Sequence, residues 1–230
     1  ENWGHQALML HRPGGNATIG AAAAAKAPPD GYTIVFVTAT HVITPHLMSV
    51  PYDAIKDFAP ITPITSVELL CVVHPSVPVK SVKDLIALAK SRPGRLNYAT
   101  SSAGGTGHLA VELFSMKVGI QMQPIAYKGG APAAADVVAG QVDLMFPNPI
   151  NVMHFVQAGK LRAIAVTGDR RLPSLPNLPT FAESGVADLD VSFWQGVLAP
   201  AGTPRAIVDK LAGEIARIMA LPDIKEKVLS

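Results

Sequence analysis

Short apolar runs alternate along the chain with stretches whose apolar residues recur at helical spacing. The β-type runs cover residues 33–38, 69–74, 96–99, 142–146 and 163–166. Helical patterns occur over residues 17–27, 81–90, 109–116 and 205–221. Alternation of this kind is typical of proteins in which helices cover a sheet, so the sequence predicts an α/β fold.

Three of the predicted helices carry start signals. Helices favour an N-terminal residue whose side chain accepts a hydrogen bond from the first turn, and they tolerate proline at the first helical position. The signals are Asn16 before the first helix, the capping box of Ser81 and Asp84, and Thr203 with Pro204 before the last helix. Residues 31–52 contain no Asp, Glu, Lys or Arg, but they include two His, two Pro and four Thr, and this mixture is too polar for a membrane span. We expect a buried strand followed by a loop there.

The composition adds constraints on the class of protein. Hydrophobic residues make up 49% of the 230 residues and charged residues 16%, a balance that excludes an intrinsically disordered chain. The 19 basic and 17 acidic residues leave a formal charge of +2, and no basic run is present, so nucleic acid is not an expected partner. The single cysteine, Cys71, lies among apolar residues, and we interpret it as a core residue.

The most informative segment is NYATSSAGGTGH, residues 97–108, in which a strand ends in small residues before a helix. Glycines allow close approach of the backbone, hydroxyls donate hydrogen bonds, and a helix start offers unpaired N–H groups. The segment lacks the lysine of a phosphate-binding loop and the glycine spacing of a dinucleotide site, so a carboxylate suits it better. A flexible turn without a ligand is the alternative. The candidate ligand-binding residues are Ser101, Ser102, Gly104, Gly105, Thr106 and His108.

A second segment, PIAYKGGAP at residues 124–132, repeats the order of strand, glycine turn and helix. Tyr127 and Lys128 are further candidates to face a ligand. The alternatives are a packed aromatic ring for Tyr127 and a solvated loop charge for Lys128.

Catalytic and metal-binding patterns are weak. Ser101 or Ser102 with His108 suggests a serine hydrolase, but the chain has no G-x-S-x-G turn. The seven histidines do not show the spacing of metal ligands, and no pair of carboxylates is positioned for acid–base chemistry. We therefore expect no metal, no cofactor and no enzymatic activity.

A series of motifs extends over nearly the whole chain. They are RPGGN at 12–16, PDGYT at 29–33, TH at 40–41, PY at 51–52, KDFAPI at 56–61, LNY at 96–98, SSAGGTGH at 101–108, YKG at 127–129, GQVD at 140–143, AGKLR at 158–162, LPT at 178–180 and APAGTP at 199–204. In this order they resemble the substrate-binding proteins of tripartite tricarboxylate transporters, also called Bug receptors.

The resemblance implies a two-lobed periplasmic binding protein fold of type II, in which each lobe is a mixed sheet flanked by helices. Lobe 1 would comprise residues 1–67 and 193–230, and lobe 2 residues 68–192. The implied function is periplasmic capture of a mono-, di- or tricarboxylate by lobe closure, with delivery to membrane permease subunits. We expect a monomer.

The family pattern also extends the candidate site. Through its motifs, Thr40, His41 and Asn148 join the ligand-binding candidates. Pro147 stands where the family commonly shows Asp, which makes an amino-acid ligand less suitable than a plain carboxylate. The resemblance implies that the family's first strand and helix and its C-terminal portion fall outside this sequence, so we expect the loop at 101–108 to face an open cleft.

Two other functions stay open. The effector-binding half of a transcription regulator has the same two-lobed architecture, although the sequence shows no DNA-binding helix-turn-helix. A small serine hydrolase using Ser102 and His108 is the second, and turnover of an ester would identify it.

Overall fold

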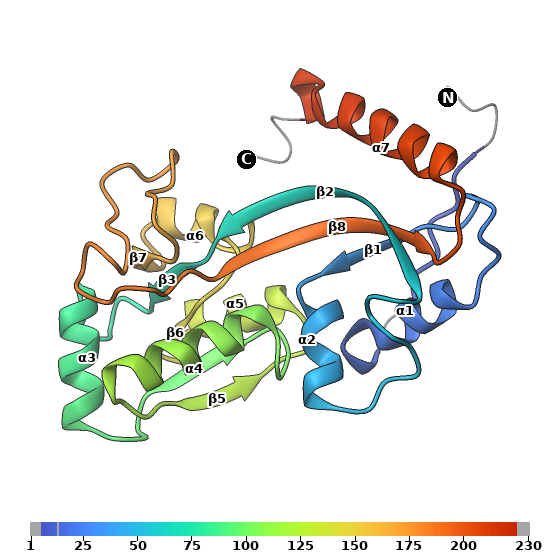
Figure 1. The fold of residues 1–230 in the computed structure, drawn as a ribbon. Helices are drawn as coiled ribbons and strands as arrows, with labels where there is room; N and C mark the ends of the chain where they lie inside the picture. The colour runs from blue at the N-terminus through green and yellow to red at the C-terminus, as the bar shows by residue number, and fades with distance from the viewer. Residues whose placement is uncertain (1–5, 13, 225–230) are drawn as a thin grey trace.

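The computed structural model describes residues 6–12 and 14–224, which form two separate sheets (Figure 1). The smaller sheet has the strand order β1-β8-β2 and is antiparallel. Its strands are β1 (Val35–Thr38), β2 (Phe58–Glu68) and β8 (Ser192–Pro200). The long strands β2 and β8 run side by side across the molecule. We call this sheet and its helices the three-stranded unit.

The larger sheet has the order β5-β4-β6-β3-β7 and mixes strand directions. Strand β4 is parallel to β5 and β6, whereas β3 is antiparallel to β6 and β7. Its strands are β3 (Leu70–Val73), β4 (Asn97–Thr100), β5 (Gln123–Ala126), β6 (Leu144–Met145) and β7 (Arg162–Val166). This sheet and its helices are the five-stranded unit. The chain passes from one unit to the other at Leu69 and returns at Val191.

Helices flank both sheets, which confirms the predicted α/β class. The three-stranded unit carries α1 (Thr18–Ala25), α2 (Thr40–Leu47), α7 (Arg205–Met219) and the short 3₁₀ helix η1 (Gly15–Ala17). The five-stranded unit carries α3 (Val82–Ser91), α4 (Thr106–Val118), α5 (Gly130–Val138), α6 (Met153–Gln157) and η2 (Pro149–Asn151). No helix in the described part of the chain is both long and apolar enough to cross a membrane.

The five-stranded sheet is covered on both faces. All four residues of β3 are buried, and alternate residues belong to different apolar clusters. Cys71 and Val73 pack with α3 and α4, while Leu70 and Val72 pack with α5 and α6. A strand buried on both faces is expected to be apolar throughout, as this one is. Cys71 is confirmed as a core residue, and its burial raises the pKa of its thiol.

The expectation of a loop after β1 is wrong, because α2 forms there. Pro45 lies inside this helix, and its β-branched neighbours lower the intrinsic helix propensity. Packing stabilises the helix instead: His41 and Thr44 are buried one turn apart on the same face.

Two of the three predicted helix caps are also wrong. Ser81 caps α3 as expected, since its Oγ accepts a hydrogen bond from the Asp84 N–H at 3.2 Å. Asn16 instead has a left-handed backbone with φ of 53° within η1, and Ala17 occupies the cap position of α1. Thr203 donates its hydroxyl to the Pro200 carbonyl at 2.8 Å, so it closes the turn before α7 rather than capping that helix.

Strand β2 has no counterpart among the predicted strands. Proline cannot donate to a sheet, so Pro60 and Pro63 obscure the strand pattern. The ladder with β8 accommodates both residues by register shifts, one between Pro60 and Thr62 and one between Pro63 and Thr65. Such irregularities bend a strand and increase its twist.

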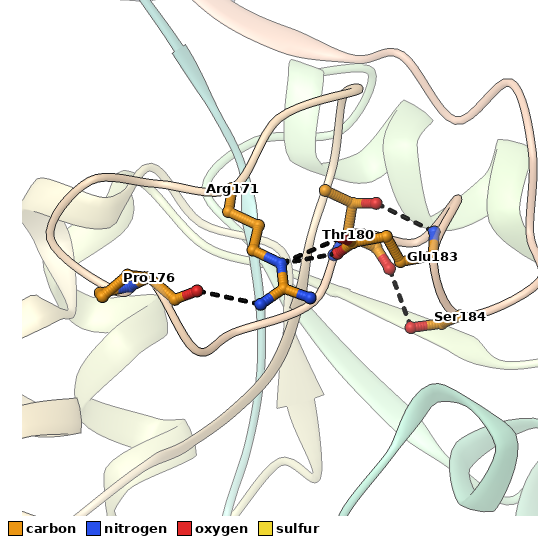
Figure 2. A network of polar contacts seen from close by, with 5 residues as sticks. All are labelled: Arg171, Pro176, Thr180, Glu183 and Ser184. Carbon is orange, nitrogen blue, oxygen red and sulfur yellow. Dashed lines mark hydrogen bonds and ion pairs between the residues drawn. The ribbon is translucent and has the colours of Figure 1, made fainter.

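The long segment between β7 and β8 is held together by Arg171 (Figure 2). Its Nε donates to both carboxylate oxygens of Glu183, and its Nη1 donates to the Pro176 carbonyl at 3.0 Å. Glu183 also accepts from the Thr180 N–H at 2.8 Å. The Arg171 side chain lowers the pKa of the Glu183 carboxyl, and the Thr180 N–H adds to this effect. The segment therefore keeps a fixed shape although much of it is exposed.

Candidate functional site

A cavity of about 70 Å³ lies where the two units meet, at the carboxyl ends of β4 and β6. This volume exceeds the ~10–15 Å³ that a cavity needs to admit one water molecule, so it can hold more than one water or part of a small ligand. The cavity is lined by Thr40, Leu69, Ala99, Thr100, Ser101, Ser102, Gly105, Thr106, Gly107, Gly130, Met145, Phe146, Pro147, Asn148, Asn151 and Phe193.

The N-terminal ends of several helices converge on this cavity. Thr40, Thr106 and Gly130 are the first residues of α2, α4 and α5, and Asn148 is the N-cap of η2. None of the three α-helices has an acidic residue in its first turn. The first turn of a helix offers N–H groups without intrahelical partners and a partial positive charge. The lining contains no charged side chain. The partial positive charge of the helix starts is therefore the main electrostatic influence on the cavity, and it favours an anionic ligand.

Thr106 carries a polar atom that lacks a partner. The residue is only 8% exposed, and its Oγ1 makes no hydrogen bond with any described residue. The preceding cap residue, Gly105, has no side chain to bond the first turn. Because buried polar groups are normally hydrogen-bonded, an orphaned hydroxyl on a residue of the cavity lining is available to a ligand or an ordered water that approaches it.

The shape of the site depends on a glycine in α4. A Cβ at Gly107 would lie 2.6 Å from the Phe146 carbonyl oxygen, much closer than packed atoms can approach. Gly107 therefore allows the start of α4 to lie directly against the end of β6. Both Gly107 and Phe146 line the cavity.

His108 supports the loop before α4 rather than lining the cavity. Its Nδ1 accepts a hydrogen bond from the Gly104 N–H at 2.9 Å, and its ring stacks on Tyr98. The Tyr98 hydroxyl donates to Glu112, whose carboxylate also lies 4.0 Å from His108 Nε2. Burial and this hydrogen bond raise the pKa of Tyr98. Both nitrogens of His108 are thus directed to structural partners.

The three-stranded unit contacts the same loop directly. Asn16 Nδ2 donates to the Ala103 carbonyl at 3.0 Å. A Cβ at Gly104 would lie 2.3 Å from Leu47 Cδ1, so the Leu47 side chain packs against this glycine. The expectation that the loop faces an open cleft is wrong at these positions, because residues from η1 and α2 lie against it.

The structure brings six of the eleven candidate residues together around the cavity. They are Thr40, Ser101, Ser102, Gly105, Thr106 and Asn148. Gly104 and His108 shape the loop from behind, as described above. The remaining three, His41, Tyr127 and Lys128, lie outside the lining.

His41 is a core residue of the three-stranded unit. Its ring stacks on Tyr52 and meets the edge of Phe58, and its Nε2 bonds the Ala54 carbonyl at 3.0 Å. Burial lowers the pKa of His41, although the hydrogen bond to Ala54 acts in the opposite direction. Its Nδ1 is buried and has no hydrogen-bond partner among residues 6–12 and 14–224.

The second glycine turn contributes through its backbone. The Tyr127 N–H donates to the Thr100 carbonyl at 2.8 Å, and the Gly129 N–H donates to Ser101 at 2.9 Å. The Tyr127 hydroxyl bonds Asp136 at 2.6 Å, and burial together with this bond raises the pKa of Tyr127 to about 12. Lys128 is exposed. The turn holds the ends of β4 and α5 together, and Gly130 reaches the cavity.

Several lining residues were not predicted. Gly107 and Gly130 fall inside the two glycine segments at 97–108 and 124–132. The sequence therefore predicted that these segments lie near a ligand, although it did not single out the two glycines. Asn151, Phe193 and Leu69 come from η2, β8 and the β2–β3 connection, and no local pattern marks them. Only the packing of distant segments places them here.

A catalytic arrangement is not formed. Among the described residues, neither Ser101 nor Ser102 hydrogen-bonds His108, because the imidazole faces Gly104 and Glu112 instead. No group of three or more His, Cys, Asp or Glu residues within 6–12 and 14–224 could hold a metal ion.

A larger hollow of about 670 Å³ lies elsewhere, beside β7. Its lining is mostly apolar, with Val156, Leu161, Leu175 and Leu178 among its residues, and it contains none of the candidate residues. Size alone does not identify a ligand site. The small cavity is the better candidate because helix starts converge there and one lining residue carries an orphaned hydroxyl.

Comparison with known proteins identifies the family and similar structures. A family model described as "Tripartite tricarboxylate transporter family receptor" matches residues 1–230. The structure resembles that of R. palustris Rpa4515 with adipate, at 38% identity and a TM-score of 0.88 over 95% of this chain and 74% of that one.

Two further solved structures are similar. Periplasmic binding protein BugD is 34% identical with a TM-score of 0.85, covering 94% of this chain and 73% of BugD. MatC from Rhodopseudomonas palustris with bound malate is 28% identical with a TM-score of 0.84, covering 92% and 73%. The chain spans 65 to 68% of the length of the first curated relatives it matches.

Proposed function

The chain belongs to the tripartite tricarboxylate transporter receptor family, and we propose that it captures a small organic carboxylate in the cavity between its two units. The observation that carries this proposal is the buried, unpartnered Thr106 hydroxyl at the start of α4. A carboxylate oxygen would accept from this hydroxyl and from the free N–H groups of the same turn. Relatives with adipate and with malate support the ligand class.

Capture would proceed by closure of two lobes on the acid. The proposed lobes are residues 1–67 with 193–230, and residues 68–192. The separation of the two sheets supports this division, and the lining supports closure because Thr40 comes from one unit and Thr106 from the other. Binding energy from both sides would then stabilise the closed arrangement.

Delivery to the permease subunits of a membrane transporter completes the proposed role. The family description supports a transporter receptor, and the similarity to periplasmic BugD supports capture in the periplasm. In this role the chain acts as a monomer and releases the acid unchanged.

The proposed ligand is a plain carboxylate rather than an amino acid. Pro147 is buried in the lining, and no carboxylate side chain lines the cavity to pair with an ammonium group. Malate and aspartate test this distinction, because they differ only in a hydroxyl or an ammonium group at one carbon. We expect malate to bind more tightly than aspartate in calorimetric titrations, and the reverse order would contradict the assignment.

The decisive variant removes the orphaned hydroxyl. Thr106→Val keeps the side-chain shape but cannot donate, and a hydrogen bond to a charged group contributes ~1.5–3 kcal/mol, so affinity for adipate and malate should fall at least about tenfold. Ser115→Ala is the matched control, because Ser115 lies in the same helix with a buried, unpartnered hydroxyl but does not line the cavity. Equal affinities in Thr106→Val and Ser115→Ala would refute the proposed site.

A further inference from the structure

One side chain, Thr167, joins the two segments that connect the units. Thr167 directly follows β7 and is fully buried. Its Oγ1 accepts a hydrogen bond from the Leu69 N–H at 2.8 Å and donates one to the Val191 carbonyl at 2.6 Å. Leu69 lies between β2 and β3, and Val191 immediately precedes β8. A single hydroxyl therefore bridges both connections.

Backbone contacts at the same place reinforce this bridge. The Thr167 N–H donates to the Leu69 carbonyl at 2.9 Å, and the Gly168 N–H donates to Leu189 at 3.0 Å. Gly168 has φ of +79°, and a Cβ there would lie 2.7 Å from Glu68 Cγ at the end of β2. The backbone after β7 is thus held closely against both connecting segments.

The segments that Thr167 bridges also contribute residues to the cavity. Leu69 lines the cavity, as does Phe193 of β8, but Thr167 does not. Thr167 can therefore influence a ligand only through the segments that it holds. Any rotation of one unit against the other must be absorbed in these segments, because the chain connects the units there.

We infer that Thr167 is a positioning residue of the hinge, whose hydroxyl keeps the two connecting segments together so that the units move as rigid bodies. For the ligand this inference rests on the proposed function, whereas the hinge itself is defined without a ligand. Replacing Thr167 with Val would leave the Leu69 N–H and the Val191 carbonyl buried without partners. Buried groups in this condition tend to regain water or new partners, so the segments would separate.

Spin labels can measure the relative placement of the units directly. Lys83 on α3 and Lys210 on α7 are exposed and belong to different units, so Lys83→Cys and Lys210→Cys supply the labelling sites. Cys71 is fully buried and stays unlabelled. In the ligand-free protein, we expect Thr167→Val to broaden the distance distribution and Thr167→Ser, which keeps the hydroxyl, to preserve it.

Thr203→Val is the matched control for loss of a buried threonine hydroxyl. Its hydrogen bond to Pro200 is local and lies within the three-stranded unit. This variant should lower stability without changing the distance distribution. If Thr167→Val and Thr203→Val give the same distribution as the parent, Thr167 has only a structural role and the inference is wrong.

Ligand binding provides the second measurement. A smaller population of closure-competent molecules raises the apparent Kd in proportion, so we expect about fivefold weaker adipate binding in Thr167→Val and recovery in Thr167→Ser. Unchanged adipate affinity in Thr167→Val would count against the positioning role. If neither adipate nor malate binds the parent, the proposed function fails, while the ligand-free distances still decide the role of Thr167.

The unmodified protein offers a test that does not depend on a variant folding. The Leu69 amide should exchange its hydrogen as slowly as the amides of β3, because it donates to Thr167 in a buried position. Exchange as fast as that of exposed loop amides would show that the bridge does not persist, and would overturn the inference.

Discussion

The two units differ in how completely their sheets are covered. In the five-stranded unit, strands carry apolar residues on both faces, and helices pack on each face to form two extended clusters. In the described part of the three-stranded unit, one small apolar cluster forms, with Ala21, Ala24, Tyr52 and Phe58 as its buried members, and buried residues such as Ala199 lie outside it. Phe36 of β1 is 66% exposed, although its neighbour Val37 is buried.

This difference indicates that different interactions stabilise the two units. The five-stranded unit is held by extensive apolar burial, whose contribution grows with the apolar area removed from water. The three-stranded unit relies more on specific contacts, such as the stacking of His41 on Tyr52, the edge contact of His41 with Phe58, and the long ladder between β2 and β8. Substitutions should therefore have different consequences in the two units.

The largest effect is expected from the core of the five-stranded unit. Phe114 is fully buried, with Phe181 and Phe146 ring centroids at 5.1 and 5.9 Å. Phe114→Ala should reduce the free energy of unfolding by about 3–5 kcal/mol, the range for large cavities. Phe58→Ala should reduce the free energy of unfolding by at least about 1 kcal/mol less than Phe114→Ala does. Few buried residues surround Phe58, so they can move into the space that its ring leaves.

Urea unfolding of both variants, with hydrogen exchange to assign each transition to a unit, would measure this contrast. An equal or larger loss for Phe58→Ala would mean that the small cluster is not the weaker one.

An intermediate effect is expected where the units meet at the loop before α4. Asn16 has a left-handed backbone that glycine adopts readily, so Asn16→Gly removes little except the hydrogen bond to Ala103. A neutral hydrogen bond contributes ~0.5–1.5 kcal/mol, so adipate affinity should fall about two- to tenfold. Stability of the five-stranded unit should not change. Calorimetry that finds the parent affinity in Asn16→Gly would remove this contact from the site.

The smallest effect concerns pH, and it should be confined to the three-stranded unit. Burial lowers the pKa of His41 below its ordinary value of 6.5, so the unfolded chain binds a proton that the folded chain resists. Stability should then decrease as the pH falls below about 6.5. Hydrogen exchange at pH 7.5 and 5.5 should show faster opening of α2 and β1 at the lower pH, with little change in β3 and β4.

His41→Gln is the control for this titration, because its amide can still donate to the Ala54 carbonyl but cannot take up a proton. The variant should lose the pH dependence. A parent protein that shows the same acid response in both units would contradict the role of His41.

The sequence predicted most of the five-stranded unit. The runs at 69–74, 96–99, 142–146 and 163–166 correspond to β3, β4, β6 and β7, and the capping box marks the start of α3. These elements are visible because both faces of the sheet are buried, which requires apolar runs. In the three-stranded unit the patterns are weaker, and α2 and β2 were missed where prolines interrupt them.

The part of the candidate site that has a local sequence signal was predicted. Small residues and hydroxyls at the end of β4 are a local signal, and Ser101, Ser102, Gly105 and Thr106 line the cavity. His108 and Tyr127 are residue types that often contact ligands. In the structure, however, the His108 imidazole lies next to the Glu112 carboxylate, and the Tyr127 hydroxyl donates to Asp136. A sequence gives the type of a side chain and not the partner that it meets.

The sequence alone determined the α/β class, the family resemblance and the loop of small residues, because each depends on the order and spacing of residues along the chain. Tertiary structure decided which helix starts converge on one cavity and that Thr167 joins Leu69 to Val191. Those residues are far apart in sequence, and their contacts exist only after burial of both sheet faces fixes the positions of the strands. Tertiary structure also decided that the Thr106 hydroxyl has no partner among the described residues, because this depends on which distant segments pack around it.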